Sequence, residues 1–118
     1  MTNTKYNIYE RIFIFVVRVI ELIKYVPKTE PNRVIIAQLL RSATSVGANA
    51  QEADGVSSKK DFIHCFTTVR KEGKETFFWL KLIGATNNTI KPRIETLLIE
   101  NGEIIAIISK IIQNSRKN

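Results

Sequence analysis

The sequence is poor in the residues that build most metal and catalytic sites. Its 118 residues include one cysteine, Cys65, and one histidine, His64. A single thiol cannot form an intrachain disulfide, and a zinc site needs about four ligands, most often cysteine and histidine. The five glycines are dispersed, so there is no glycine-rich loop for phosphates. We therefore expect a protein that is not an enzyme and holds no metal or other cofactor.

Long hydrophobic runs are also missing. The longest apolar stretch covers residues 12–17, far below the roughly 18–20 residues that cross a bilayer. The N-terminal residues show no apolar stretch followed by a small-residue cleavage site, so a secretory signal is not expected. The sequence thus predicts a cytoplasmic protein without a membrane partner, and its length is that of a single domain.

Acidic residues are outnumbered by basic ones. The chain has 18 Lys and Arg against 11 Asp and Glu, a net charge of +7 and a pI near 9.8. Such an excess on a small domain favours polyanionic partners such as RNA or DNA. Charged residues make up 25% and hydrophobic residues 44% of the chain, which are ordinary values for a globular protein and exclude a disordered one.

Helical periodicity runs through four stretches, and no stretch alternates as a strand does. The predicted helices cover residues 7–26, 31–54, 59–85 and 92–115. Pro27 is expected to end the first helix. Asn101-Gly102 is compatible with a hairpin turn, but the apolar phase persists through it and favours one continuous helix. Short connections make neighbouring helices antiparallel, so the predicted fold is an all-α, up-down-up-down four-helix bundle over the whole chain.

The first predicted helix has an apolar face that is too wide for one neighbour. Four residues widen it: Phe13, Ile14, Val17 and Ile20. Such a helix is either central in its own bundle or also buried against another subunit.

The second predicted helix carries four polar residues on one side, and they are Arg41, Ser45, Asn49 and Glu52. One interpretation is a recognition strip in which Arg41 binds a phosphate or a carboxylate. The other, which we favour, is a hydrogen-bonded ladder that fixes helix register or a subunit contact. In that ladder Glu52 would pair with Arg41 or with a base on another helix.

The third predicted helix separates its charges. At about 100° per residue, six basic residues share a sector of about 120°, beside a narrower sector with Asp61, Glu72 and Glu75. We call these six residues the basic stripe: Lys59, Lys60, Arg70, Lys71, Lys74 and Lys81. The basic stripe is the candidate nucleic-acid-binding site, and the alternative is an ordinary solvated face.

Four apolar residues flank or lie among these charges, and they are Phe77, Phe78, Trp79 and Leu82. Bases of single-stranded nucleic acid can stack on such rings while the lysines hold phosphates. The interpretation that we favour is an oligomer interface, in which large aromatic residues are the usual buried anchors.

Two segments resemble a known family. Residues 38–53, QLLRSATSVGANAQEA, resemble the signature of the bacterial four-helix-bundle proteins encoded in intervening sequences of 23S ribosomal RNA genes. The order Arg, Ala, Ser, Asn, Glu is its most specific part. Residues 58–63 and 71–80 resemble the third helix of that family, and the similarity spans nearly the whole chain. The sequence departs from the family pattern at two positions. Ala50 stands where a larger aliphatic residue is usual, and Gly73 stands where alanine is usual; both are changes of packing.

The resemblance implies a left-handed antiparallel bundle that assembles into a ring-shaped homopentamer with a central channel. The family is similar to the accessory proteins of diversity-generating retroelements, basic pentamers that bind a reverse transcriptase and nucleic acid. It has no established catalytic residues, and the location of its genes is no evidence of a ribosomal protein. Two hypotheses stay open: an oligomer that binds RNA or DNA without strong sequence preference, and a scaffold that holds a partner polypeptide.

Overall fold

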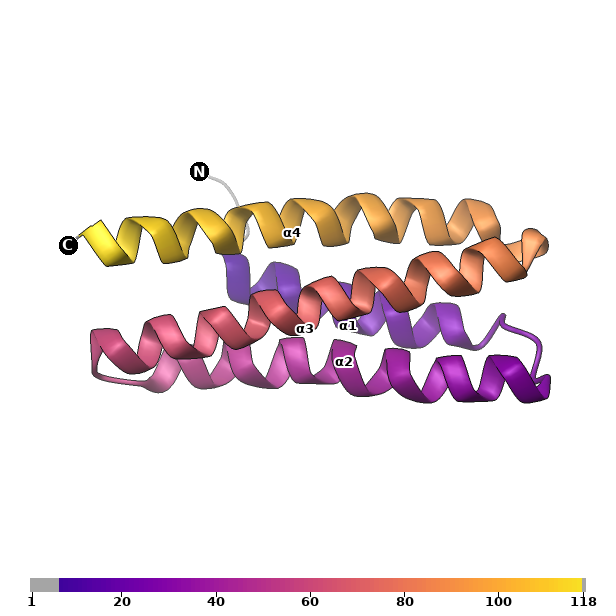
Figure 1. Cartoon of the computed structure of the whole chain (residues 1–118), viewed down its shortest axis with the longest axis horizontal. Coiled ribbons are helices and arrows are strands. Elements are labelled where there is room, and N and C mark those ends of the chain that lie inside the picture. Colours follow the sequence, from indigo (N-terminus) through magenta and orange to yellow (C-terminus); the bar gives the residue numbers. More distant parts are fainter. Residues whose placement is uncertain (1–6, 118) are drawn as a thin grey trace.

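The computed structural model describes residues 7–117, which form four α-helices joined by short connections (Figure 1). The helices are α1 Ile8–Ile23, α2 Glu30–Gly55, α3 Lys59–Thr86 and α4 Lys91–Lys117, with a 3-10 turn, η1 Asn88–Ile90, before α4. Consecutive helices run in opposite directions, which confirms the predicted up-down-up-down bundle. The molecule is elongated, with extents of 47 × 30 × 20 Å.

Side-chain caps explain where the first three helices begin. The side-chain oxygens of Asn7, Thr29 and Ser58 each accept a hydrogen bond from the backbone N–H three residues later, at 2.9, 3.3 and 3.1 Å. The first turn of a helix leaves its N–H groups without intrahelical partners, and each cap satisfies one of them. Pro31 follows in the first turn of α2, where a proline costs no hydrogen bond.

The end of α1 differs from the prediction. The sequence placed it at residue 26, directly before Pro27, but α1 ends at Ile23. The next three N–H groups each bond to the carbonyl three residues back, which is the tighter 3-10 pattern. Lys28 Nζ then donates to the carbonyls of Ile23 at 2.8 Å and Val26 at 2.6 Å, so these groups need no further helical turn. The other predicted bounds lie within two residues of the observed ones.

The core is apolar and draws on all four helices. Among its fully buried large side chains are Phe15 of α1, Leu39 of α2, Phe66 and Leu80 of α3 and Ile108 of α4. Burying one such side chain stabilises the fold by about 1.5–3 kcal/mol. These residues keep the periodicity from which the helices were predicted, so the hydrophobic pattern and the core agree.

Asn101 lies in the middle of α4, which continues through Gly102 without a break, as the apolar phase predicted. The Asn101 side chain is 2% exposed. In the amide orientation that satisfies both neighbouring groups, its nitrogen donates to the Gly73 carbonyl and its oxygen accepts from the Phe77 N–H, both at 3.2 Å. An undisturbed helix bonds these two backbone groups to each other. The side chain from α4 therefore joins the hydrogen-bond ladder of α3 and fixes the register of the two helices.

Two glycines let α4 approach α3 closely. A Cβ atom on Gly84 would lie 2.8 Å from Cγ2 of Ile94, and a Cβ atom on Gly73 would lie 3.3 Å from Cγ1 of Ile105. The glycine that departs from the family pattern at position 73 thus lies where α4 packs tightly. The close packing of the two helices offsets the cost of about 1 kcal/mol for a glycine inside a helix.

The outer face of α1 is uncovered. Phe13 is 69% exposed, Val17 42%, Ile20 39% and Ile14 37%. Helix α1 packs on α2 and α4 and is an outer helix of the bundle. Of the two explanations for its wide apolar face, a central position is therefore wrong, and burial against another polypeptide stays a prediction.

Candidate nucleic-acid interface

The basic stripe lies on the outer side of α3. Arg70 is half-buried and the five lysines of the stripe are exposed. Lys59 and Lys81 are 22 positions apart, which is about 33 Å along a helix axis. No ion pair joins a residue of the stripe to another residue of the described chain, 7–117. Their positive charges are therefore available to a partner.

The acidic residues Glu72 and Glu75 lie at the edge of α3 that faces α2. Arg41 of α2 bonds to both carboxylates, with its Nη1 at 3.4 Å from Oε1 of Glu72. The indole N–H of Trp79 donates to Glu75 at 3.0 Å. The third acid, Asp61, is exposed in the first turn of α3. Because two of its three acids are engaged by α2 or by Trp79, α3 keeps a surplus of positive charge on its outer side.

The four apolar residues near the stripe differ in exposure. Phe78 is 54% exposed, whereas Phe77, Trp79 and Leu82 are half-buried. Trp79 packs against the core, and its ring meets that of Phe78 edge-on, with centroids 4.9 Å apart. Phe78 is therefore the most exposed of the four, and the oligomer interface at these residues stays a prediction.

Phe78 stands among the lysines of the stripe. Lys74 lies four positions before it, Lys71 seven positions before it and Lys81 three positions after it. These spacings place all three lysines on the same side of the helix as Phe78. An exposed ring surrounded by ammonium groups is the arrangement on which a base can stack while the lysines bind the adjacent phosphates.

The polar residues of α2 do not form one ladder. Asn49 Nδ2 donates to the carbonyl of Ser45 at 2.9 Å and to its hydroxyl at 3.1 Å. The predicted pairing of Glu52 with Arg41 or with a base on another helix is wrong for the described chain, where Glu52 is exposed and makes no ion pair. Eleven positions, about 16 Å of helix, separate Arg41 from Glu52, whereas the carboxylates of α3 lie directly across. The guanidinium group of Arg41 is paired with Glu72 and Glu75 and is therefore not free to bind a phosphate.

The single histidine and the single cysteine differ in exposure. His64 is exposed and Cys65 is buried, and burial raises the pKa of the Cys65 thiol, with the charges of Glu52 and Asp61 adding to the effect. Residues 7–117 contain no group of three or more His, Cys, Asp or Glu side chains that could hold a metal ion. None of the helices in this range is long and apolar enough to cross a membrane.

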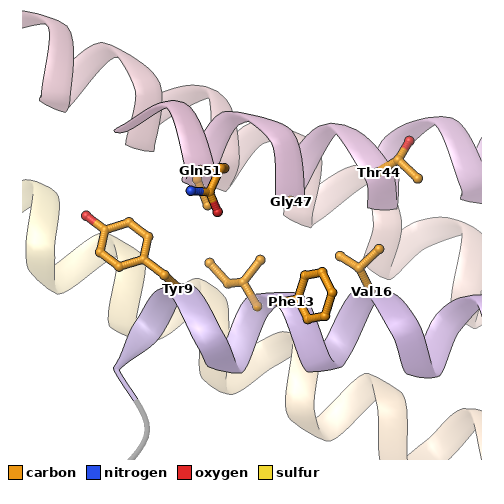
Figure 2. Close-up of a pocket in the computed structure, with 8 residues that line it drawn as sticks. Tyr9, Phe13, Val16, Thr44, Gly47 and Gln51 are labelled. Atoms are coloured by element: carbon orange, nitrogen blue, oxygen red, sulfur yellow. The ribbon is translucent and has the colours of Figure 1, made fainter. Parts of the chain in front are cut away.

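Two cavities beside α1 were not predicted from the sequence. One, of about 320 Å³, lies between α1 and α2, where Tyr9, Phe13 and Val16 rise towards α2 and Gly47 presents no side chain (Figure 2). The other, of about 230 Å³, lies between α1 and α4. Small residues on α2 were the one signal in the sequence, and they do not reveal how far α1 stands from its neighbour.

The fold and its surface define a class: a basic, antiparallel four-helix bundle with an exposed cationic face on one helix. The model of the 23S rRNA-intervening sequence protein family matches residues 4–110, and the chain belongs to this family. It is also similar to a crystal structure of a protein with unknown function from the S23 ribosomal protein family of Bacteroides thetaiotaomicron. The TM-score is 0.81 at 32% identity, over 90% of this chain and 98% of that chain. No curated protein matches the chain.

Proposed function

We propose that the protein is a non-enzymatic, oligomeric, cytoplasmic protein that binds RNA or DNA through phosphate contacts, without strong sequence preference. The observation that carries the proposal is the division of charge on α3. Two of its acids bond to Arg41 or Trp79, while the basic stripe makes no ion pair with the described chain and surrounds an exposed Phe78. Lysine ammonium groups bind phosphates as point charges and read no base, so the expected binding is general.

Oligomerisation would strengthen such binding. Each chain carries a net charge of +7, and the homopentamer implied by the family resemblance would bring five basic stripes together. Linked binding sites raise avidity without any new contact, provided that one nucleic-acid molecule can reach several of them. The summed positive field would also speed the encounter with a polyanion.

Fluorescence anisotropy tests the proposal with labelled single-stranded RNA, double-stranded RNA and duplex DNA, on protein whose mass is known from light scattering. We expect affinity to fall steeply between about 50 and 200 mM salt, by a factor on the order of a thousand if six phosphates are contacted. Binding that does not change with salt would contradict the proposal, because phosphate contacts release counterions.

Charge-reversal variants locate the site. Changing Lys71, Lys74 and Lys81 together to Glu should abolish binding and leave the oligomer intact, since all three side chains are exposed. The matched control changes Lys24, Arg33 and Lys110 to Glu, which alters the net charge equally at exposed positions outside α3. Equal losses in both triple variants would show that total charge, and not the basic stripe, drives binding.

A substitution of Phe78 tests stacking. Phe78→Ala should weaken binding of single-stranded RNA by about 5- to 150-fold, the factor that corresponds to one stacked base, and should leave duplex binding nearly unchanged. Val34→Ala is the control, because Val34 is 62% exposed on α2, away from the stripe. Equal effects of the two variants would contradict stacking on Phe78.

A second candidate function, a scaffold that holds a partner polypeptide, is favoured by the exposed apolar face of α1. Capture of partners from lysate with and without nuclease separates the two functions. A defined protein that stays bound after nuclease treatment would support the scaffold, and loss of all captured material would support nucleic-acid binding.

A further inference from the structure

The cavity between α1 and α4 combines an apolar floor with two arginines. Leu22 of α1 and Leu97 of α4 are buried and form its base. Arg18 lines it from α1 and Arg93 from α4, so each of the two helices contributes one arginine to the lining. The cavity of about 230 Å³ is lined by polar or charged residues beside the two leucines, which suits a small ligand that carries a charged group.

The carboxylates near these arginines are each hydrogen-bonded to another base. Glu21 also lines the cavity, but Lys24 donates to both of its oxygens at 3.1 and 3.0 Å. Glu100 lies outside the lining; its hydrogen bonds of 2.7 and 2.9 Å come from Arg11 and lower its pKa, and the charge of Arg18 also contributes to lowering this pKa. Within residues 7–117, neither Arg18 nor Arg93 makes an ion pair. The cavity therefore favours an oxyanion.

An aromatic ring lies beside this charge. The guanidinium carbon of Arg93 lies 4.1 Å from the centroid of the Tyr25 ring, in a cation–π contact. Tyr25 lines the cavity and is still 57% exposed. A flat ring of a ligand can stack on the exposed part of this pair, since both arginine and tyrosine present π faces. Thr96 also lines the α4 wall, and its hydroxyl donates to the Arg93 carbonyl at 2.9 Å.

Two arginines that can bind an oxyanion lie beside a ring on which a flat group can stack, and a nucleotide carries both a phosphate and a flat base. We propose that the α1–α4 cavity binds a mononucleotide, with its phosphate between Arg18 and Arg93 and its base against Tyr25. Planar guanidinium groups match phosphate oxygens in pairs, which a lysine does not. This site is built from α1 and α4, whereas the basic stripe lies on α3, so the two sites are independent of each other.

Backbone-amide NMR titration of the ¹⁵N-labelled protein with AMP tests the proposal, with adenosine, inorganic phosphate and benzoate as comparison probes. We expect saturable shifts at Tyr25, Thr96 and their neighbours with AMP. Adenosine lacks the anion and phosphate lacks the ring, so each should bind at least about tenfold more weakly, the loss expected for one such contact. Benzoate binding as tight as that of AMP would overturn the assignment to a nucleotide.

Variants of exposed residues complete the test. Arg18→Gln and Arg93→Gln should each weaken AMP binding about tenfold, and Glu21→Gln should strengthen it by removing a negative charge from the wall. Arg116→Gln is the matched control: it removes the same charge on α4, 23 positions and about 35 Å from Arg93. AMP binding that is equal in all three arginine variants, or absent in the unchanged protein, would overturn the proposal.

The outcome is separable from nucleic-acid binding by α3. The triple variant of Lys71, Lys74 and Lys81 to Glu should keep its AMP response, while Arg18→Gln should keep its affinity for duplex DNA. Loss of the AMP response in the triple variant would overturn a separate site between α1 and α4.

Discussion

Single atoms decide how tightly α3 and α4 pack. A Cβ atom at Gly84 would lie 2.8 Å from Cγ2 of Ile94, which is closer than a van der Waals contact allows, whereas a Cβ atom at Gly102 would meet nothing within 4 Å. The two glycines therefore have opposite roles, although both are helical. Gly84 is required by a close approach, and Gly102 only weakens its own helix.

This difference predicts opposite effects of one added methyl group. Gly84→Ala should lower the free energy of unfolding by about 1–3 kcal/mol, because the new Cβ pushes against Ile94. Gly102→Ala should raise it by up to about 1 kcal/mol through helix propensity. Urea unfolding followed by circular dichroism measures both. A stabilised Gly84→Ala variant would show that α4 moves away at little cost.

The thiol of Cys65 is predicted to be unreactive in the folded protein. Burial raises its pKa, so the thiolate that reacts with alkylating agents is scarce, and the surrounding core blocks access. Iodoacetamide should modify Cys65 slowly at pH 7.5 and rapidly in denaturant, with mass spectrometry as the readout. Equal rates in the two conditions would contradict the burial of this side chain.

At the scale of elements, an arginine–carboxylate contact helps to place α1 against α4. Helix α1 has 16 residues, whereas the other three have 26–28, and it borders both cavities. Arg11 ties it to α4 by two hydrogen bonds to Glu100 and a further ion pair with Glu103. A two-point Arg–carboxylate contact fixes orientation as well as distance, and so sets where α1 sits.

The Arg11–Glu100 contact predicts a pH dependence of stability. The hydrogen bond from Arg11 lowers the pKa of Glu100, so its contribution is present above the ordinary carboxyl pKa of about 4.3 and is lost as the pH falls through the lowered value. Glu100→Gln should therefore reduce the free energy of unfolding by about 1 kcal/mol at pH 7 and by almost nothing near pH 2.

Glu95→Gln serves as the control for Glu100→Gln. Glu95 is an exposed acid of α4 that makes no ion pair with the described chain, so its removal should change stability little at either pH. Thermal unfolding at pH 2, 4 and 7 compares the three proteins. A penalty for Glu100→Gln that does not change with pH would show that the side chain acts by packing alone.

At the scale of the whole molecule, the exposed apolar residues are concentrated on α1. Phe13, Val17 and Ile20 form an exposed apolar stripe on α1. Phe13 also lines the α1–α2 cavity (Figure 2). An exposed apolar stripe of this kind marks a contact surface more often than open solvent. Helix α1 is therefore a stronger candidate for the subunit contact than Phe77, Trp79 and Leu82 of α3, which are half-buried within the chain.

Polar substitutions on α1 test this surface. The double variant Phe13→Ser, Val17→Ser should lower the mass measured by light scattering from an oligomer towards the 13.5 kDa chain, with helical content unchanged. Val34→Ser, at a residue 62% exposed on α2, is the matched control. An oligomer that survives the double variant would place the contact on another face.

The local features of the fold could be predicted because they depend on neighbours in the chain. Ser58 and Thr29 start helices through bonds to residues three positions away, and the apolar phase through Asn101 and Gly102 carried α4 across a possible turn. The end of α1 escaped prediction because it depends on Lys28 folding back onto carbonyls of the preceding turn. That contact leaves no trace in periodicity.

The sequence alone determined the family, the four helices, their antiparallel order and the charge separation along α3, since these follow from spacing within one chain segment. Only the tertiary structure decided what each polar group faces: that Arg41 bonds to carboxylates of α3 and not to Glu52, and that Arg18 and Arg93 line one cavity. Such contacts depend on the rotation and separation of whole helices. A shift of a few ångströms changes those quantities and leaves the hydrophobic pattern of each helix unaltered.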